Sequence, residues 1–229
     1  MSIAALIPAR GGSRALPWKN LAKVGGRSLV QRAIETARAV PEIEEIVVSS
    51  EAEEILDHAG DCGATPLRRP EELARDAAPM RDVVRHFLDE YPESGTLVLL
   101  QPTSPLRRPE DVSRCLDALA AAPSAVTLAP VEHPIEWFFR ISDEGLVDPV
   151  FGRNRVVARR QDSDAVYVLN GAVFAARCDH LRRGGWFTDE GTVGIVMPRA
   201  RSIDVDDSLD LAVVRLIDES TAEGGGEQR

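Results

Sequence analysis

The chain has 229 residues, of which 44% are hydrophobic, so it can bury one substantial core and is expected to form one α/β domain. Its formal net charge of −10 disfavours binding to nucleic acid or to a membrane surface, because both need a broad basic patch. No apolar run approaches the ~20 residues that cross a bilayer, and no basic segment precedes the first apolar one, as a signal peptide would require. The three cysteines are widely spaced and odd in number, which favours free thiols in the cytoplasm.

Strands and helices alternate in the expected secondary structure of the first half. The expected elements, in chain order, are a strand at 3–7, a helix that Ser28 and Gln31 begin with capping-box spacing, a strand at 45–50, helices at 53–58 and 79–91, a strand at 96–100, a helix from Pro109 to about 121 and a strand at 125–128. This alternation predicts right-handed βαβ units. The expected fold is therefore α/β and three-layered, with a mostly parallel, Rossmann-like sheet between helices.

The second half is expected to be less regular. Residues 131–199 hold two of the three tryptophans. We expect this region to form a small excursion from the main domain that carries subunit contacts. A last helix is expected over 208–219, with Ser208 as its N-cap and the following side chains facing inward: Leu209, Ala212, Val213 and Leu216. Residues 221–229 contain three consecutive glycines and are expected to be disordered, so the single domain is assigned to residues 1–220.

Polar segments follow three of the expected strands, at residues 10–19, 49–51 and 101–107. Ligands of such folds bind at the carboxyl ends of the strands. The first segment contains two glycines, which let backbone N–H groups approach a ligand, and the cations Arg10, Arg14 and Lys19. It matches neither the P-loop nor the dinucleotide-binding pattern. Cations gathered on an acidic chain still indicate an anion, and a glycine-containing loop after a strand suits a polyphosphate.

Four segments together resemble one enzyme family. Residues 7–20, Ile-Pro-Ala-Arg-Gly-Gly-Ser-Arg-Ala-Leu-Pro-Trp-Lys-Asn, resemble the N-terminal signature of the acylneuraminate cytidylyltransferases, with Arg14 and Ala15 in place of the usual Lys and Gly. Residues 100–107 match the family's Leu-Gln-Pro-Thr-Ser-Pro-Leu-Arg, residues 69–76 match Arg-Pro-x-x-Leu-Ala-x-Asp, and residues 204–211 match Asp-x-Asp-x-x-x-Asp-Leu. Because they occur in order along nearly the whole chain, their joint occurrence is more specific than any one of them.

The resemblance implies a nucleotide-diphospho-sugar transferase fold with a dimerisation excursion, and a cytidylyltransferase reaction. CTP and a small acidic acceptor would give a CMP-conjugate and pyrophosphate. The catalytic residues implied are Arg10, Arg14 and Lys19. The implied nucleotide-binding residues are Ala9, Arg10, Gly11, Gly12, Ser13, Asn20 and Arg69, of which Arg69 would help to hold the cytosine. The alternative for Arg69 is a simple pairing with Glu72 at a helix start.

Asp204 and Asp206 form the expected metal site. They lie two residues apart on an expected strand, so their side chains share a face and repel each other unless a cation joins them. Mg²⁺ favours one or two carboxylates together with phosphate oxygens and water. The resemblance likewise implies that these two aspartates hold Mg²⁺ on the triphosphate. The alternative is a solvated acidic turn.

The acceptor site is expected from a further resemblance over residues 160–174. The implied acceptor-binding residues are Gln101, Arg160, Tyr167, Asn170, Phe174, Trp186 and Phe187. The family inserts an aromatic pair like Trp186–Phe187 into a partner's site, which implies a homodimer, although an ordinary core pair is the alternative. Val168 replaces a family Arg and Glu136 lies near the register of a family Lys. These changes leave room for a modified nonulosonic acid, an eight-carbon sugar acid or a phosphonate as the acceptor.

Two other classes of protein share some of these features. Sugar-1-phosphate nucleotidyltransferases share the general fold, but their Gly-x-Gly-Thr/Ser-Arg/Lys signature is absent. A non-catalytic nucleotide-binding module is the second alternative, and the intact Asp204 and Asp206 pair argues against it.

Overall fold

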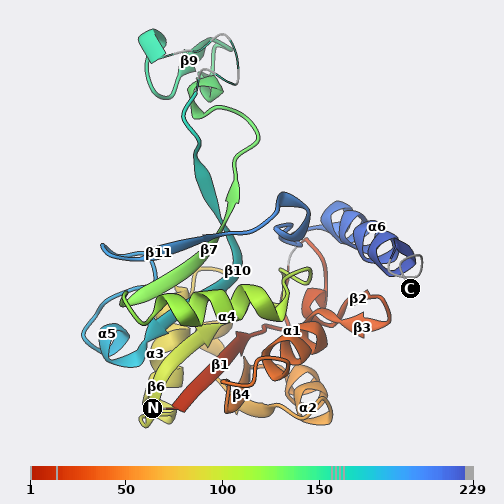
Figure 1. Ribbon diagram of the computed structural model, residues 1–229. Coiled ribbons are helices and arrows are strands. Elements are labelled where there is room, and N and C mark those ends of the chain that lie inside the picture. Colours follow the sequence, from red (N-terminus) through yellow and green to blue (C-terminus); the bar gives the residue numbers. More distant parts are fainter. Residues whose placement is uncertain are drawn as a thin grey trace.

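A seven-stranded sheet forms the centre of the protein in the computed structural model, which describes residues 2–13, 15–155, 157, 159, 161 and 163–224 (Figure 1). Its strands lie side by side in the order β11 (Val193–Val196), β7 (Ser124–Pro130), β10 (Tyr167–Arg177), β6 (Ser94–Leu99), β1 (Ser2–Pro8), β4 (Glu45–Ser50) and β5 (Thr65–Arg68). β10 is antiparallel to both of its neighbours, and the other pairs are parallel. The predicted mostly parallel sheet is confirmed.

Helices cover both faces of this sheet. One face packs against α1 (Leu29–Arg38), α2 (Glu53–Asp61) and α4 (Pro109–Ala118). The other packs against α3 (Met80–Glu90) and α5 (Cys178–Arg182). Side chains of β1 alternate between the two layers: Ala5 and Ile7 contact the first, and Ala4 and Leu6 contact the second. Burial on both sides explains why the strand is a continuous apolar run in the sequence.

The N-terminus of α1 shows half of the predicted capping box. Ser28 Oγ accepts a hydrogen bond from the Gln31 backbone N–H at 3.0 Å, as expected of an N-cap. The Gln31 side chain does not return to the cap, because its Nε2 donates to Glu35 Oε1 at 2.9 Å on the next turn. The helix start is therefore predicted correctly, and the reciprocal contact is not formed.

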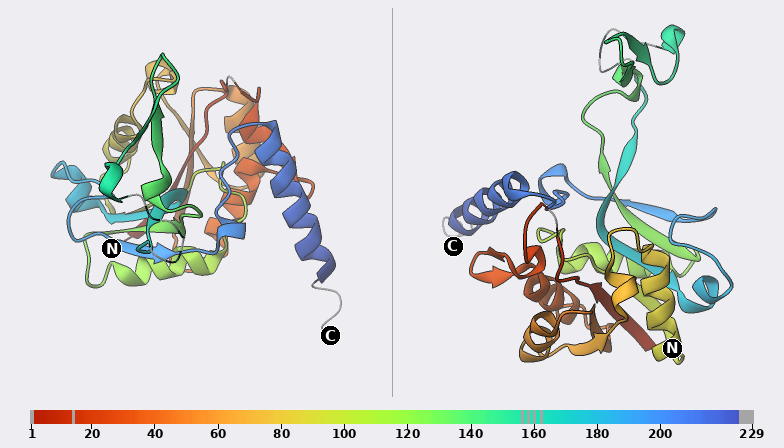
Figure 2. Two further views of the ribbon diagram at one scale, coloured as in Figure 1. Left: turned by 90° about the horizontal axis from the view of Figure 1, so that it is seen from above. Right: turned by 180° about the vertical axis from the view of Figure 1, so that it is seen from behind.

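An arm of residues 131–166 projects from the sheet between β7 and β10 (Figures 1 and 2). It carries a short hairpin of β8 (Phe139–Ile141) and β9 (Val147–Pro149). The arm is smaller than the expected excursion over 131–199, because β10 and β11 are strands of the central sheet. Among its described residues, the large apolar side chains that are exposed are Trp137, Phe138, Phe139, Ile141, Leu146, Val147 and Phe151.

The last helix, α6 (Ser208–Gly224), differs from the prediction in three ways. It includes residues 221–224, which were expected to be disordered, whereas 225–229 lie outside the described residues. Asp207 caps it instead of Ser208, since Asp207 Oδ1 accepts from the Asp210 N–H at 3.0 Å. The side chains expected to face inward, Leu209, Ala212, Val213 and Leu216, are exposed.

Packing beside the sheet explains the orientation of α6. Among the α6 side chains that the structure describes, Leu211 and Val214 are buried, and they join a small cluster with Val24, Leu29 and Val205. Figure 1 shows α6 next to the hairpin of β2 (Lys23–Val24) and β3 (Arg27–Ser28) instead of over the sheet. Apolar residues occur on two faces of this helix, and their spacing alone does not identify the buried one.

Within the described residues, no helix combines the length and apolar character needed to cross a membrane. The cysteines are all free: Cys115 and Cys178 are buried and Cys62 is partly buried.

Candidate active site

A cavity of about 300 Å³ opens at the edge of the sheet where β1 and β6 end. The cations that line it are Arg10, Lys19, Arg69 and Arg75. The carboxylates that line it are Asp76, Asp204 and Asp206. The rest of the lining is Pro8, Asn20, Leu73, Ala78, Met80, Val83, Gln101, Pro102 and Thr103. The cavity therefore lies where ligands of parallel α/β sheets bind, and charges of both signs face it.

The loop after β1 is fixed at its two ends. Ala9 donates its backbone N–H to Ser49 O of β4 at 2.9 Å, which continues the sheet by one bond. The buried Asn20 donates from Nδ2 to Arg10 O at 2.9 Å and so closes the loop at its far end. Ala9 is wholly buried and does not line the cavity, so it supports the loop instead of contacting a ligand through its side chain.

Gly11 occupies a tight position inside this loop. Its N–H donates to Glu51 Oε1 at 2.7 Å, and a Cβ added to it would lie 2.9 Å from the Cβ of Ala52. A side chain at this position would therefore require Ala52 or the loop to shift. The N–H of Gly11 was expected to face a phosphate and is instead used within the protein. The N–H groups of Gly12 and Ser13 have no hydrogen-bond partner among the described residues.

Two cations of the cavity are paired with carboxylates that also line it. Arg10 Nη1 lies 2.5 Å from Asp76 Oδ1, and Lys19 Nζ lies 3.1 Å from Asp206 Oδ1. These contacts join segments far apart in the sequence at one cavity. Side chains of both signs at such distances suit a ligand that brings negative charge together with a cation.

Arg69 is held at the cavity wall by Glu51. Its Nη2 lies 3.1 Å and its Nε 3.4 Å from Glu51 Oε2, and its backbone N–H donates to Ser50 O at 2.9 Å. Burial lowers the pKa of the Arg69 guanidinium, and the carboxylate of Glu51 opposes that shift. Arg69 thus pairs with Glu51 instead of Glu72, the partner considered from the sequence.

Asp204 and Asp206 line the cavity from an extended segment that pairs with no strand. The expected strand is not formed, but the expected alternation is present, because Val205 between them is buried. The Val205 N–H donates to Thr103 O at 2.7 Å, which ties the segment to the loop after β6. Withdrawal from water raises the pKa of Asp204, and a hydrogen bond with the Thr103 side chain opposes the shift.

Few side chains at the cavity could bind a metal ion. Among the described residues, no group of three or more His, Cys, Asp or Glu side chains gathers as a preformed metal site. Asp210 faces away, since its Oδ2 accepts the N–H of Asp206 at 2.9 Å. Two carboxylates at a polar cavity fit Mg²⁺, which takes its other oxygens from water and phosphate.

Comparison with known proteins identifies the family. A family model described as Cytidylyltransferase matches residues 4–177. The chain belongs to the cytidylyltransferase family. It is 31% identical to the CMP-N,N'-diacetyllegionaminic acid synthase of Legionella pneumophila, over 97% of this chain and 99% of that one. It is also 31% identical to the N-acylneuraminate cytidylyltransferase of Streptococcus agalactiae serotype V, over 88% of this chain and 49% of that one, so it spans about half of that relative.

The fold of this cytidylyltransferase is shared with a solved structure at low sequence identity. A CMP:2-keto-3-deoxy-manno-octonic acid synthetase, solved in complex with CTP, superimposes with a TM-score of 0.73 at 18% identity. The match covers 96% of this chain and 100% of the other. The predicted family, fold and nucleotidyltransferase class are therefore confirmed.

Among the described residues of this cytidylyltransferase that were predicted to bind the acceptor, Gln101 is the one that lines the cavity. It follows β6 and faces Gly171, whose φ of +70° is one that glycine adopts without strain. A Cβ at position 171 would lie 2.6 Å from Gln101 Oε1. Gly171 therefore leaves the space that the Gln101 side chain occupies.

Asn170 is a buried structural residue and does not line the cavity. Its Oδ1 accepts from Thr127 Oγ1 at 2.6 Å and from the Ala172 N–H at 3.2 Å. Its Nδ2 donates to Ser202 Oγ at 2.9 Å and contacts Met197 Sδ. Both ends of the amide are therefore satisfied within the core, and the role of Asn170 in acceptor binding stays a prediction.

The aromatic residues assigned to the acceptor lie elsewhere. Phe187 is wholly buried in the cluster beneath α3 and packs against Phe174 at a ring distance of 5.7 Å. Trp186 lies under the guanidinium of Arg81, 4.7 Å from ring centroid to Cζ. Tyr167 is half-exposed at the base of the arm. Phe187 thus packs in the core of its own chain, as the core-pair alternative describes, and its insertion into a partner's site stays a prediction.

Arg14 and Arg160, predicted to act in catalysis and in acceptor binding, lie outside the described residues. Three residues that shape the cavity were not assigned from the sequence: Glu51, Asp76 and Thr103. All three belong to segments singled out there, since Glu51 ends the polar turn after a strand and Asp76 ends the Arg-Pro-x-x-Leu-Ala-x-Asp motif. Their pairing with Arg69 and Arg10 depends on tertiary structure, which spacing does not reveal.

Proposed function

We propose that the protein transfers CMP from CTP to the hydroxyl group of a small anionic sugar. The acceptor oxygen forms a bond to the α-phosphorus of CTP, the bond from that phosphorus to the bridging oxygen breaks, and pyrophosphate leaves. The acceptor hydroxyl loses its proton to solvent or to a basic group of the site. The products are a CMP-sugar and pyrophosphate.

The observation that supports this proposal best is that cationic and anionic side chains line the same cavity. Arg10 and Lys19 approach it from the loop after β1, and Asp204 and Asp206 approach it from the segment before α6. A triphosphate with Mg²⁺ satisfies both sets, because its oxygens attract the cations and its metal attracts the carboxylates. A carrier of neutral ligands has no use for such a pairing.

The chain's own residues act mainly by position and charge. Negative charge grows on the leaving oxygens in the transition state, and the fixed cations Arg10 and Lys19, with Arg14, stabilise it. The N–H groups of Gly12 and Ser13, which pair with nothing in the described part of the chain, can add hydrogen bonds to the same oxygens. Arg69, fixed at the wall, contacts the cytosine ring. Asp204 and Asp206 would hold Mg²⁺, which supplies charge neutralisation on the pyrophosphate group.

A nine-carbon nonulosonic acid is the proposed acceptor class. The relatives named for legionaminic acid and for N-acylneuraminate support it at 31% identity. Glu136 and Val168, which replace cations of the family pattern, do not line the cavity of their own chain. Glu136 lies on the arm, where the hydroxyl of Ser163 donates to it at 2.8 Å and lowers its pKa. An eight-carbon sugar acid or a phosphonate is the alternative acceptor.

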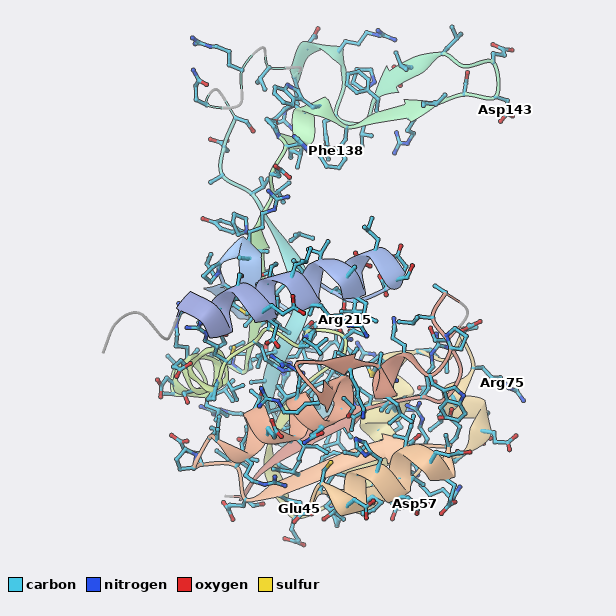
Figure 3. The ribbon with its side chains drawn as sticks, turned by 90° about the vertical axis from the view of Figure 1, so that its right-hand side faces the viewer. Glu45, Asp57, Arg75, Phe138, Asp143 and Arg215 are labelled. Carbon is cyan, nitrogen blue, oxygen red and sulfur yellow. The ribbon has the colours of Figure 1, made fainter. Side chains whose placement is uncertain are left out.

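A homodimer whose arms complete each other's sites is the proposed assembly, in the cytoplasm. The exposed aromatic and aliphatic side chains of the arm support it, because a monomer gains nothing by exposing them. Figure 3 shows Phe138 and Asp143 on the arm, well above the body of the protein that carries Arg75. An arm that extends from the body in this way can reach a second copy.

Acceptor-dependent release of pyrophosphate tests the proposal. CTP, UTP and ATP are each supplied with Mg²⁺ and with a panel of nonulosonic acids, an eight-carbon keto-sugar acid and phosphonates. We expect release with CTP and with an acidic sugar of the first class. Release with the eight-carbon acid or a phosphonate alone would favour the alternative acceptor. CTP binding with no release for any acceptor would favour a nucleotide-binding module.

A further inference from the structure

Glu51 connects two parts of the cavity that have separate jobs in the proposed reaction. One carboxylate oxygen, Oε1, accepts the N–H of Gly11 at 2.7 Å in the phosphate-facing loop. The other, Oε2, accepts from Arg69 Nη2 at 3.1 Å and from Nε at 3.4 Å. Glu51 thus divides its two oxygens between the loop after β1 and the arginine after β5.

The contact leaves one side of the Arg69 guanidinium available. Nε and Nη2 are used by Glu51, whereas Nη1 has no partner among the described residues. The Arg69 side chain is almost fully buried, with 4% of its surface exposed, and it still lines the cavity. Glu51 therefore fixes the orientation of the Arg69 guanidinium from one edge. Because the guanidinium is planar and rigid, this contact also fixes the direction in which Nη1 donates.

Fixing a donor matters for telling cytosine from uracil. The ring nitrogen N3 of cytosine accepts a hydrogen bond, whereas N3 of uracil carries a proton and donates. A donor held in one place pairs with the first and opposes the second. A guanidinium that is free to turn can instead reach a carbonyl oxygen of either base. Selectivity by hydrogen bonding consequently depends on the rigidity of the donor as well as on its presence.

We propose that Glu51 is a positioning residue for nucleotide selection. It fixes Arg69 as a reader of the base and, through Gly11, holds the phosphate loop in register with that reader. This inference rests on the proposed cytidylyltransferase reaction with CTP. Glu51 does not itself line the cavity, so it acts through Arg69 and Gly11.

The neighbouring pair Glu53–Arg68 supplies a matched control. Glu53 begins α2, and its carboxylate forms an ion pair with Arg68, the residue before Arg69. Both of these side chains are more than half exposed, and neither lines the cavity. The two pairs therefore share residue types and adjacent stretches of the chain, and they differ in whether the arginine reaches the site.

The main test compares Glu51→Gln with Glu53→Gln. Glutamine keeps an oxygen for the Gly11 N–H, but its amide group opposes the donors of Arg69 or leaves them with a neutral acceptor. For Glu51→Gln we expect KM for CTP to rise about tenfold with kcat within about threefold, because the charge-assisted hydrogen bonds that hold Arg69 in its base-contacting orientation are weakened. We expect the ratio of kcat/KM for CTP over UTP to fall about tenfold and KM for the acceptor to stay unchanged. Glu53→Gln should match the wild type in all of these.

A second variant and a binding measurement keep the test decisive. Glu51→Asp retains the charge but is one methylene too short to hold Gly11 and Arg69 together, so it should lose selectivity even where Glu51→Gln fails to fold. Calorimetric binding of CTP and UTP should show the same loss of preference without turnover. A wild type that lacks CTP-dependent activity contradicts the proposed reaction. An active wild type with unchanged CTP preference in both Glu51 variants would overturn the role of Glu51 alone.

Discussion

Lys19 and Asp206 lie 187 residues apart in the sequence, and their Nζ and Oδ1 atoms are 3.1 Å apart at the cavity. The pair links the loop after β1 to the segment that precedes α6. Only 15% of the Lys19 side chain is exposed, whereas Asp206 is mostly exposed. The lysine is thus the more firmly placed of the two, and a metal-bound triphosphate can take over both charges without moving it far.

Replacing Lys19 by Ala should reduce kcat by about 10²- to 10³-fold, because the change removes a fixed cation from the developing charge of the leaving group. Lys23→Ala is the matched control, since Lys23 is an exposed lysine on β2 that does not line the cavity. The measurement is the steady-state rate of pyrophosphate release at saturating CTP. A Lys19→Ala rate within a few-fold of wild type would remove this residue from the mechanism.

Gly11→Ala should destabilise the fold by about 1–3 kcal/mol, because the added Cβ must displace Ala52 and the loop. Gly12→Ala should change the free energy of unfolding by about 0.5 kcal/mol or less, because a Cβ there meets nothing within 4 Å. Urea unfolding of both variants measures the difference. Equal stability of the two variants would contradict the packing described for Gly11.

Asn170→Ala should lower the free energy of unfolding by at least about 2 kcal/mol, because it leaves the buried Thr127 hydroxyl and the Ala172 N–H without their acceptor. Val168→Ala, on the same strand with a half-exposed side chain, should lower it by about 1 kcal/mol or less. Thermal or urea unfolding compares them. A stable Asn170→Ala protein whose defect is confined to acceptor KM would restore the ligand-binding role expected from the sequence.

Much of the fold follows from local sequence patterns, but strand pairings between distant segments do not. β1 and β4 are apolar on both faces and are read directly, and their carboxyl ends indicate the ligand-binding edge. β10 was missed because Gly171, with its positive φ, interrupts the alternation in mid-strand. Its pairing with both β6 and β7 is a long-range contact that no local pattern records.

Some site residues can be identified from sequence motifs, whereas others are evident only from the tertiary structure. Motif residues of the loops, such as Arg10, Lys19, Arg69 and Asp204, do line one cavity. Asn170 also belongs to a motif, yet its side chain forms hydrogen bonds within the core. A motif alone does not show whether a residue contacts a ligand or stabilises the fold. Glu51 shows the converse, since its partners become evident only when β4 and β5 are placed side by side.

Charged substitutions on the arm should abolish the proposed dimer. Phe139 and Ile141 are 44% and 73% exposed on β8, and replacing both by Asp should give a monomer with strongly reduced activity. The control is Leu209→Asp with Leu216→Asp on α6, where the side chains are 70% and 66% exposed and lie on the main body. Sedimentation velocity reports the state of each. A monomeric wild type, or a dimer disrupted only by the α6 changes, would contradict an interface built on the arm.

In the proposed reaction, the bond between the α- and β-phosphates of CTP breaks and CMP passes to the acceptor. The most direct measurement follows two labels, with the wild-type protein, Mg²⁺ and a nonulosonic acid: [α-³²P]CTP in one reaction and [γ-³²P]CTP in the other. The account predicts that the α label appears in the sugar conjugate and the γ label in pyrophosphate, in equal amounts and only when acceptor is present. Transfer of the γ label to the sugar, or its release as free phosphate without acceptor, would contradict cytidylyl transfer.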